Sequence, residues 1–228
     1  AIQGLEDGHM TVKLGDGTEE RFELGEILLN ATGRLPALDG LDLAAVGLDP
    51  KDLGIDGARF QTKVPHVFIA GDATGDRAIL HEANLEGEVA GRNAARVASG
   101  SSDLVTYDPD NPPLMAIFSD PPAASLGLSP QHCEAQGIAY ESAIKHFPQQ
   151  GRGIVVGAKY GFVRLVAEPN AGRILGCQML GPRADDMIHI PAAVMRLGGT
   201  VAQMRNVPWY HPTLAEAFIE VTRELNGS

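Results

Sequence analysis

Alternating hydrophobic and polar positions predict short strands near both ends of the chain. Residues 9–14 and 19–24 alternate on either side of Gly15-Asp16-Gly17, which is typical of a β-hairpin. Proline and glycine around 169–172 indicate a second hairpin turn. Further strand-like patterns occur in the second half at 115–118, 139–146, 153–159, 161–168 and 173–181.

Two apolar runs between these regions predict buried strands. Residues 26–31 form one, which opens into a loop at Thr32-Gly33-Arg34. Residues 64–70 form the other and end in Gly71-Asp72, which would place a carboxylate at the carboxyl end of a strand. In open α/β sheets, ligands bind at that edge.

Helical patterns complete the outline. Residues 78–98 are rich in Ala and Glu and run into Ser99-Gly100-Ser101-Ser102, where we expect the main boundary. Ser129-Pro130 has the form of a cap followed by a first helical residue. Three more helices are expected at 185–197, at 201–206 and from Pro212 onward. The order predicts a partial α/β segment over 1–105, followed by an α+β domain over 106–228, in which helices cover one face of an antiparallel sheet.

Composition narrows the function classes. The 228 residues are 44% hydrophobic and 21% charged, as in globular proteins, and no apolar run reaches the length of a membrane span. A net charge of -11 disfavours charge-driven binding to nucleic acid or anionic membranes. Cys133 and Cys177 are too far apart for a CxxC pair, so we expect reduced thiols in a cytoplasmic protein. The start Ala-Ile-Gln-Gly, without Met or a signal pattern, suggests a fragment.

His211 and Glu216 are the first candidate catalytic pair. Pro212 is expected at the first helical position, which would leave His211 just outside the helix. Glu216 could then reach back to an imidazole nitrogen, fix the tautomer and raise the basicity of the ring. The alternative is a helix-entry histidine beside a solvated first-turn acid that suits the helix dipole.

The other strand ends allow ligand binding or simple turns. Asp72 could accept hydrogen bonds from sugar or ribityl hydroxyls, and the helix near Ala78 would point N–H groups into the same crevice; the alternative is a turn acid that caps the helix. Gly33 alone favours a turn. No G-x-G-x-x-G occurs, and His189 is taken as structural. The remaining histidines share no spacing, so no metal site is expected: His9, His66, His81, His132 and His146.

Five segments, in this order, resemble the pyridine nucleotide-disulfide oxidoreductases, the flavoenzyme family of dihydrolipoamide dehydrogenase, glutathione reductase and mercuric reductase. Each segment is weak singly, but together they span nearly the whole chain with family-like spacing, and the last favours a dihydrolipoamide dehydrogenase-like enzyme. The segments are LNATGRLP at 29–36, VFIAGDATG at 67–75, FSDPPAASLGL at 118–128, GCQMLG at 176–181 and HPTLAE at 211–216.

The resemblance implies roles for particular residues of a parent enzyme that passes a hydride between NAD(P)H, FAD and a disulfide, possibly of lipoamide. His211 would be the acid–base on a thiol of the other subunit of a homodimer, with Glu216 as its orienting partner. Asp72 would bind the FAD ribityl chain with Gly71 beside it. The remaining roles are backbone near the flavin from Ala78, Ile79, Leu80 and His81, and a border with the nicotinamide-nucleotide domain from Ala31, Gly33 and Arg34.

Departures from the family keep a second hypothesis open. The redox-active cysteine pair and the first dinucleotide fingerprint belong to an N-terminal half absent from this sequence, so the chain alone is expected to be inactive and to retain neither FAD nor NAD(P). Trp209 stands where many dihydrolipoamide dehydrogenases carry another histidine. The alternative is a stand-alone dimerisation module without a redox role. Hydrolysis by His211 and Glu216 is set aside because no G-x-S-x-G elbow supplies a nucleophile.

Overall fold

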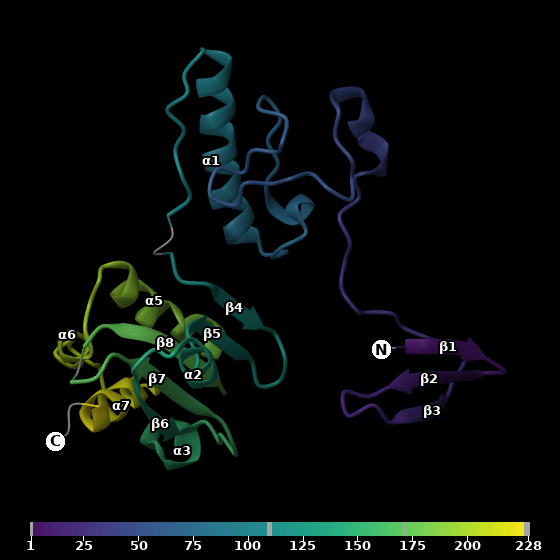
Figure 1. Cartoon of the computed structure of the whole chain (residues 1–228). Coiled ribbons are helices and arrows are strands. Elements are labelled where there is room, and N and C mark those ends of the chain that lie inside the picture. The colour runs from purple at the N-terminus through teal and green to yellow at the C-terminus, as the bar shows by residue number, and fades with distance from the viewer. Residues whose placement is uncertain (1, 109–110, 171, 226–228) are drawn as a thin grey trace.

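The computed structural model describes residues 2–108, 111–170 and 172–225. The chain forms a small N-terminal sheet, a middle segment built around one long helix, and a C-terminal unit in which helices pack on a five-stranded sheet (Figure 1). The predicted class, an α+β domain with an antiparallel sheet preceded by another segment, is confirmed.

The N-terminal sheet is a three-stranded antiparallel meander in the order β1-β2-β3. Its strands are β1 (Ile2–Glu6), β2 (His9–Lys13) and β3 (Glu19–Glu23). The predicted hairpin corresponds to β2 and β3, where Met10 pairs with Phe22. The sequence analysis missed β1, and no residue of the three strands is fully buried.

The buried strand predicted at 26–31 is not formed. Residues 25–37 contain no strand, and Ile27, Leu29 and Leu35 are 88%, 84% and 92% exposed. A buried strand needs neighbours for its backbone groups and its apolar side chains, and the described residues supply none here. The prediction of a buried strand at 26–31 is therefore wrong.

The middle segment has a small core and short 3₁₀ turns around α1 (Leu80–Ala98). Leu38, Leu48 and Leu53 form the core. The strand predicted at 64–70 is reduced to an isolated bridge, where the Ile69 N–H donates to the Phe60 carbonyl at 3.0 Å. Asp72 therefore does not end a sheet strand. The 3₁₀ turns are η1 (Asp39–Leu41), η2 (Leu43–Val46) and η3 (Gly71–Thr74).

The C-terminal sheet is antiparallel throughout, in the order β4-β5-β8-β7-β6. One row of side chains crosses all five strands and faces the core: Leu114, Leu126, Cys177, Leu165 and Ala143. The hairpin turn predicted at 169–172 includes residue 171, which lies outside the described residues. The strands are β4 (Leu114–Ile117), β5 (Ala123–Gly127), β6 (Glu141–His146), β7 (Phe162–Ala167) and β8 (Ile174–Leu180).

Three helical segments cover this core face. α4 packs on β4 and β5, α5 on β8, and α7 on β6 and β7, and their apolar side chains join the same buried cluster. No helix among the described residues is both long and apolar enough to cross a membrane. The helices are α2 (Pro130–Gln136), α3 (Gly151–Val155), α4 (Ala184–Met187), α5 (His189–Arg196), α6 (Val201–Arg205) and α7 (Ala217–Leu225), with 3₁₀ turns η4 (Phe147–Gln149) and η5 (Leu214–Glu216).

Two predictions in this unit are wrong. The strand expected at 153–159 is instead the short helix α3, which starts because the Gln150 side chain accepts a hydrogen bond from the Gly153 N–H. The single helix expected at 185–197 is divided at Ile188 into α4 and α5. Pro191 has no N–H to donate to the carbonyl four residues back, which weakens the helix at this point.

Candidate functional site

His211 and Glu216 contact each other at the start of the last helical segment. Nδ1 of His211 lies 2.9 Å from Oε1 of Glu216, and the His211 side chain is 81% exposed while that of Glu216 is 19% exposed. An ionised carboxylate only accepts hydrogen bonds, so Nδ1 carries the proton in this contact. In a neutral ring, Nε2 then keeps its lone pair, on a side chain that is largely exposed.

Thr213, and not Pro212, begins the helical segment. Thr213 has an extended backbone and is the N-cap of η5, and its N–H donates to Oε2 of Glu216 at 2.8 Å. The prediction that Pro212 is the first helical residue is therefore wrong. Thr213-x-x-Glu216 matches the capping-box pattern, a local sequence signal for a helix that begins after Thr213.

Glu216 thus uses both carboxylate oxygens. The Thr213 N–H, and next the His211 ring, lower the pKa of the Glu216 carboxyl below its usual value, because both contacts favour the ionised form. An ionised Glu216 fixes the His211 ring and would stabilise a positive charge on it. The pair can accept a proton at Nε2 and return it.

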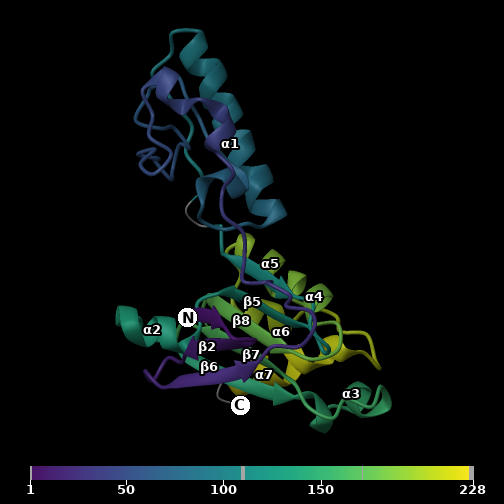
Figure 2. The same ribbon diagram turned by 90° about the vertical axis from the view of Figure 1, so that its right-hand side faces the viewer.

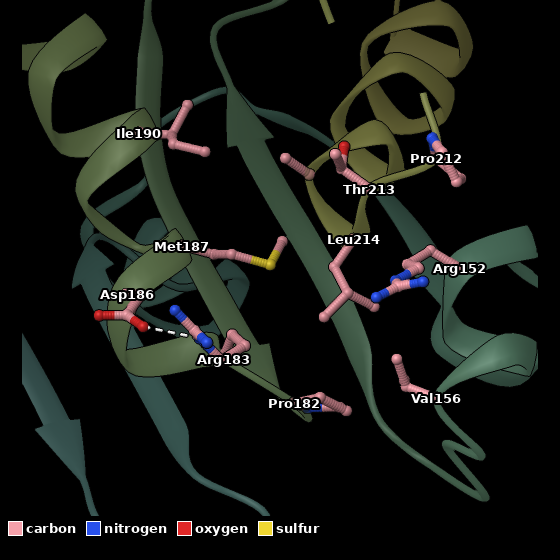
Figure 3. A pocket seen from close by; sticks show the side chains of 11 residues that line it. Arg152, Val156, Pro182, Arg183, Asp186, Met187, Ile190, Pro212, Thr213 and Leu214 are labelled. Carbon is pink, nitrogen blue, oxygen red and sulfur yellow. Dashed lines mark hydrogen bonds and ion pairs between the residues drawn. The ribbon is translucent and has the colours of Figure 1, made fainter. Parts of the chain in front are cut away.

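A pocket of about 690 Å³ borders this loop (Figure 3). Pro212, Thr213, Leu214 and Ala215 contribute to its wall, so the pocket lies beside the segment between His211 and Glu216. The opposite wall carries Met187 and Ile190, and the Arg183 guanidinium pairs with Asp186 at 2.8 Å. Arg152 and the apolar side chains Val156 and Pro182 complete the lining.

The second predicted set gathers around the amino-terminal half of α1. The Gly71 N–H donates to Oε2 of the buried Glu86 on α1 at 2.7 Å. Gly71 has φ +70°, and a Cβ there would lie 2.9 Å from the Ala83 Cβ, so only glycine fits this close approach to the helix. Asp72, the next residue, is exposed.

The structure brings Arg34 to Asp72. Their side chains form an ion pair of 3.1 Å across 38 positions of sequence, although both are exposed and such a pair contributes little stability. Gly33 lies beside it in coil with φ +107°. The segment predicted to border the nicotinamide-nucleotide domain, at Gly33 and Arg34, therefore lies next to the segment predicted to bind FAD, at Gly71 and Asp72.

Residues 78–81 lie at the entry to α1, which begins two residues later than the predicted start at Ala78. Ile79 is the N-cap, the helix begins at the exposed Leu80, and Nε2 of His81 lies 3.8 Å from Oε1 of Glu82. The residues just after an N-cap expose backbone N–H groups. Residues 72–82 thus carry both a hydrogen-bond acceptor, the Asp72 carboxylate, and hydrogen-bond donors, the first backbone N–H groups of α1.

Buried polar groups on α1 were not predicted. Glu82 accepts from the Tyr107 hydroxyl at 2.7 Å and from Arg77 at 3.2 Å. Burial raises the pKa of the Glu86 carboxyl, and burial followed by the bond to Glu82 raises the pKa of Tyr107. Glu82 and Glu86 are four residues apart on one helix face, a spacing that could have revealed them.

The two predicted sets are not brought together. Figures 1 and 2 both show α1 standing away from the sheet unit that carries α7, and no hydrogen bond or ion pair within the described ranges joins the sets. Cys133 and Cys177 are buried, and burial raises the pKa of both thiols, so neither is an activated nucleophile. No cluster of potential metal ligands occurs in the part of the chain that the structure describes.

Comparison with known proteins gives one consistent family. Residues 114–222 match the family described as pyridine nucleotide-disulphide oxidoreductase, dimerisation domain. The chain is 34% identical over 216 residues to a dihydrolipoyl dehydrogenase of Halobacterium salinarum, covering 93% of this chain and 44% of that protein. For a dihydrolipoyl dehydrogenase of Haloferax volcanii the identity is 32% over 227 residues, with 97% and 46% covered.

Solved structures show the same fold. LpdA from Mycobacterium tuberculosis superposes with a TM-score of 0.74 at 22% identity, covering 96% of this chain and 46% of that one. The HOCl-induced flavoprotein disulfide reductase RclA from Escherichia coli gives 0.74 at 18% identity, with 96% and 48% covered. The chain therefore spans about half the length of the proteins it matches.

The buried Glu86–Gly71 bond can be tested by substitution. We expect Glu86→Ala to destabilise the chain by about 1–3 kcal/mol, because the buried Gly71 N–H loses its acceptor. Glu86→Gln keeps an acceptor and removes a charge that burial disfavours, so it should cost less at neutral pH. Chemical denaturation measures both, and Glu88→Gln, an exposed pair partner of Arg92, is the control. Equal losses for Ala and Gln would contradict this account.

The double contact of Glu216 predicts a pH dependence. Because folding lowers the pKa of Glu216, its ionised form stabilises the native state above the ordinary value near 4.5, and this contribution is lost as the pH falls through the lower folded pKa. The stability advantage of the wild type over Glu216→Gln should therefore shrink as the pH falls from 4.5 toward 3. Glu224→Gln, exposed on α7, is the control. A difference independent of pH would argue against the ionised contact.

Proposed function

We propose that the chain is the dimer-forming, proton-handling half of a flavin-dependent disulfide oxidoreductase, because residues 114–222 match the pyridine nucleotide-disulphide oxidoreductase dimerisation-domain family. The parent enzyme would be dihydrolipoamide dehydrogenase-like, as the names of several relatives suggest. It would move electrons between NAD(P)H, FAD and a dithiol or disulfide substrate such as lipoamide.

The contact between His211 and Glu216 carries this proposal. Nδ1 is occupied by the carboxylate at 2.9 Å, which leaves Nε2 available on an exposed ring. A substrate thiol gives its S–H proton to Nε2 and becomes the thiolate, and the resulting imidazolium is stabilised by Glu216. In the reverse direction the imidazolium returns the proton to a thiolate leaving group.

The middle segment is proposed to contribute half of a cofactor site. The exposed Asp72 carboxylate suits the hydroxyls of a ribityl chain, and the first turn of α1, with Ala78, Ile79, Leu80 and His81 at its entry, presents backbone donors. When bound, FAD and NAD(P) supply the hydride and electron transfer. Gly71 keeps the Asp72 turn close against α1, while Gly33 and Arg34 border it.

A homodimer completes the proposal. The resemblance to the pyridine nucleotide-disulfide oxidoreductases implies that His211 would act on a substrate thiol of the other subunit. Cys133 and Cys177, which are buried and 44 positions apart, do not form a redox pair. The pocket beside residues 212–215 is open to a partner surface or a substrate chain, with apolar side chains on both walls. Residues 1–105 would form the C-terminal part of the FAD/NAD(P)-binding region, and residues 106–228 would form the interface.

The role of His211 is tested in a flavin-loaded full-length protein that contains this chain. We expect His211→Gln to reduce disulfide turnover about a hundredfold or more, because general acid–base catalysis is typically worth that much. His66→Gln, an exposed histidine of the middle segment, is the matched control. The isolated 228-residue chain should show no turnover.

Two outcomes would count against the proposal. Full activity of His211→Gln would remove the acid–base role. If the chain forms a stable dimer, and the full-length protein that contains it has neither bound flavin nor a redox-active cysteine pair, the chain is better described as a dimerisation module without redox activity.

A further inference from the structure

Gln150 is a buried polar side chain far in sequence from the candidate site. It is 3% exposed and lies between η4 and α3. Its backbone N–H donates to the Phe147 carbonyl at 3.0 Å, and its carbonyl accepts from Ile154 at 2.9 Å. Gly153 packs so closely that a Cβ there would lie 2.1 Å from the Phe147 carbonyl oxygen. The base of the Gln150 side chain is therefore firmly held.

The Gln150 amide joins two segments that are 63 positions apart. Oε1 accepts from the Gly153 N–H at 2.6 Å, and Nε2 donates to the Thr213 carbonyl at 2.8 Å. Only one orientation of the amide satisfies both partners, because a backbone N–H can only donate and a carbonyl can only accept. The bond to Gly153 is buried and the bond to Thr213 is partly buried, and because the Gln150 side chain itself is buried, losing either bond leaves one of its amide atoms without a protein partner.

Thr213 is consequently held on both of its peptide groups. Its carbonyl is bound by Gln150, and its N–H is bound by Glu216 Oε2 at 2.8 Å. The Glu216 backbone N–H also points to that carbonyl, but its nitrogen is 3.4 Å from the oxygen, so the side chain of Gln150 supplies the shorter bond. The second oxygen of Glu216 contacts His211. A continuous chain of bonds runs from Gln150 through Thr213 and Glu216 to the imidazole.

We propose that Gln150 is a positioning residue for His211, acting through Thr213 and Glu216. The catalytic part of this inference rests on the proposed function. The two bonds of the Gln150 amide, to Gly153 and Thr213, which we call the clamp, are a property of this chain alone. A side chain that only capped α3 would need Oε1 alone. The use of Nε2 on Thr213 is what connects the rigid η4–α3 segment to the loop that carries the acid–base pair.

Gln150→Glu separates the two contacts. The carboxylate keeps an acceptor for Gly153 but has no donor for Thr213, and an ionised oxygen would repel the Thr213 carbonyl. By NMR on the 228-residue chain, we expect the pKa of Glu216 to rise toward its ordinary value. The Thr213 amide should exchange about fivefold faster, the effect of one typical hydrogen bond. Gln149→Ala, an exposed neighbouring glutamine, should change neither.

A measurement on the unaltered chain keeps the test valid if Gln150 variants unfold. Protonating Glu216 by acid titration should shift the side-chain amide resonances of Gln150 and leave those of Gln149 in place. The inference is overturned if a folded Gln150→Glu leaves Glu216 and Thr213 unchanged, or if the Gln150 resonances ignore the Glu216 titration. If both readouts move as expected while His211→Gln retains full turnover, the clamp stands and the proposed function fails.

Discussion

One carboxylate fixes the part of this structure on which the functional account depends. Glu216 accepts the Thr213 N–H at the start of the last helical segment and the His211 ring on its other oxygen. The same segment continues into α7, whose Phe218 and Val221 are buried against the five-stranded sheet. The packing of α7 therefore anchors the segment that carries Glu216, and Glu216 in turn contacts the His211 ring, whose side chain is 81% exposed.

The sequence predicted best what is locally determined. The β2–β3 hairpin, the Ser129-Pro130 helix start and the strands around Leu165 and Cys177 follow from neighbouring residues and side-chain alternation. The apolar runs at 26–31 and 64–70 have the composition of buried strands but lack strand neighbours among the described residues. Their apolar pattern indicates that they need a packing surface, but it does not show whether the rest of the chain supplies one.

The candidate site divides in the same way. His211 and Glu216 are only five positions apart, so their contact is predictable from the sequence. The role of Thr213 is equally local, because T-x-x-E is a capping-box pattern. Gln150 had no signal, since a glutamine 63 positions away is recognised only when the fold places its amide against Thr213. The approach of Arg34 to Asp72 likewise depends on tertiary structure.

Sedimentation equilibrium on the purified 228-residue chain, with an absorbance scan for flavin in the same cell, tests the central claim most directly. The account predicts a dimer without bound flavin, because residues 114–222 match a dimerisation-domain family while the middle segment is proposed to contribute only part of a cofactor site. A monomer at every concentration would contradict the claim that this chain carries a self-sufficient dimer interface.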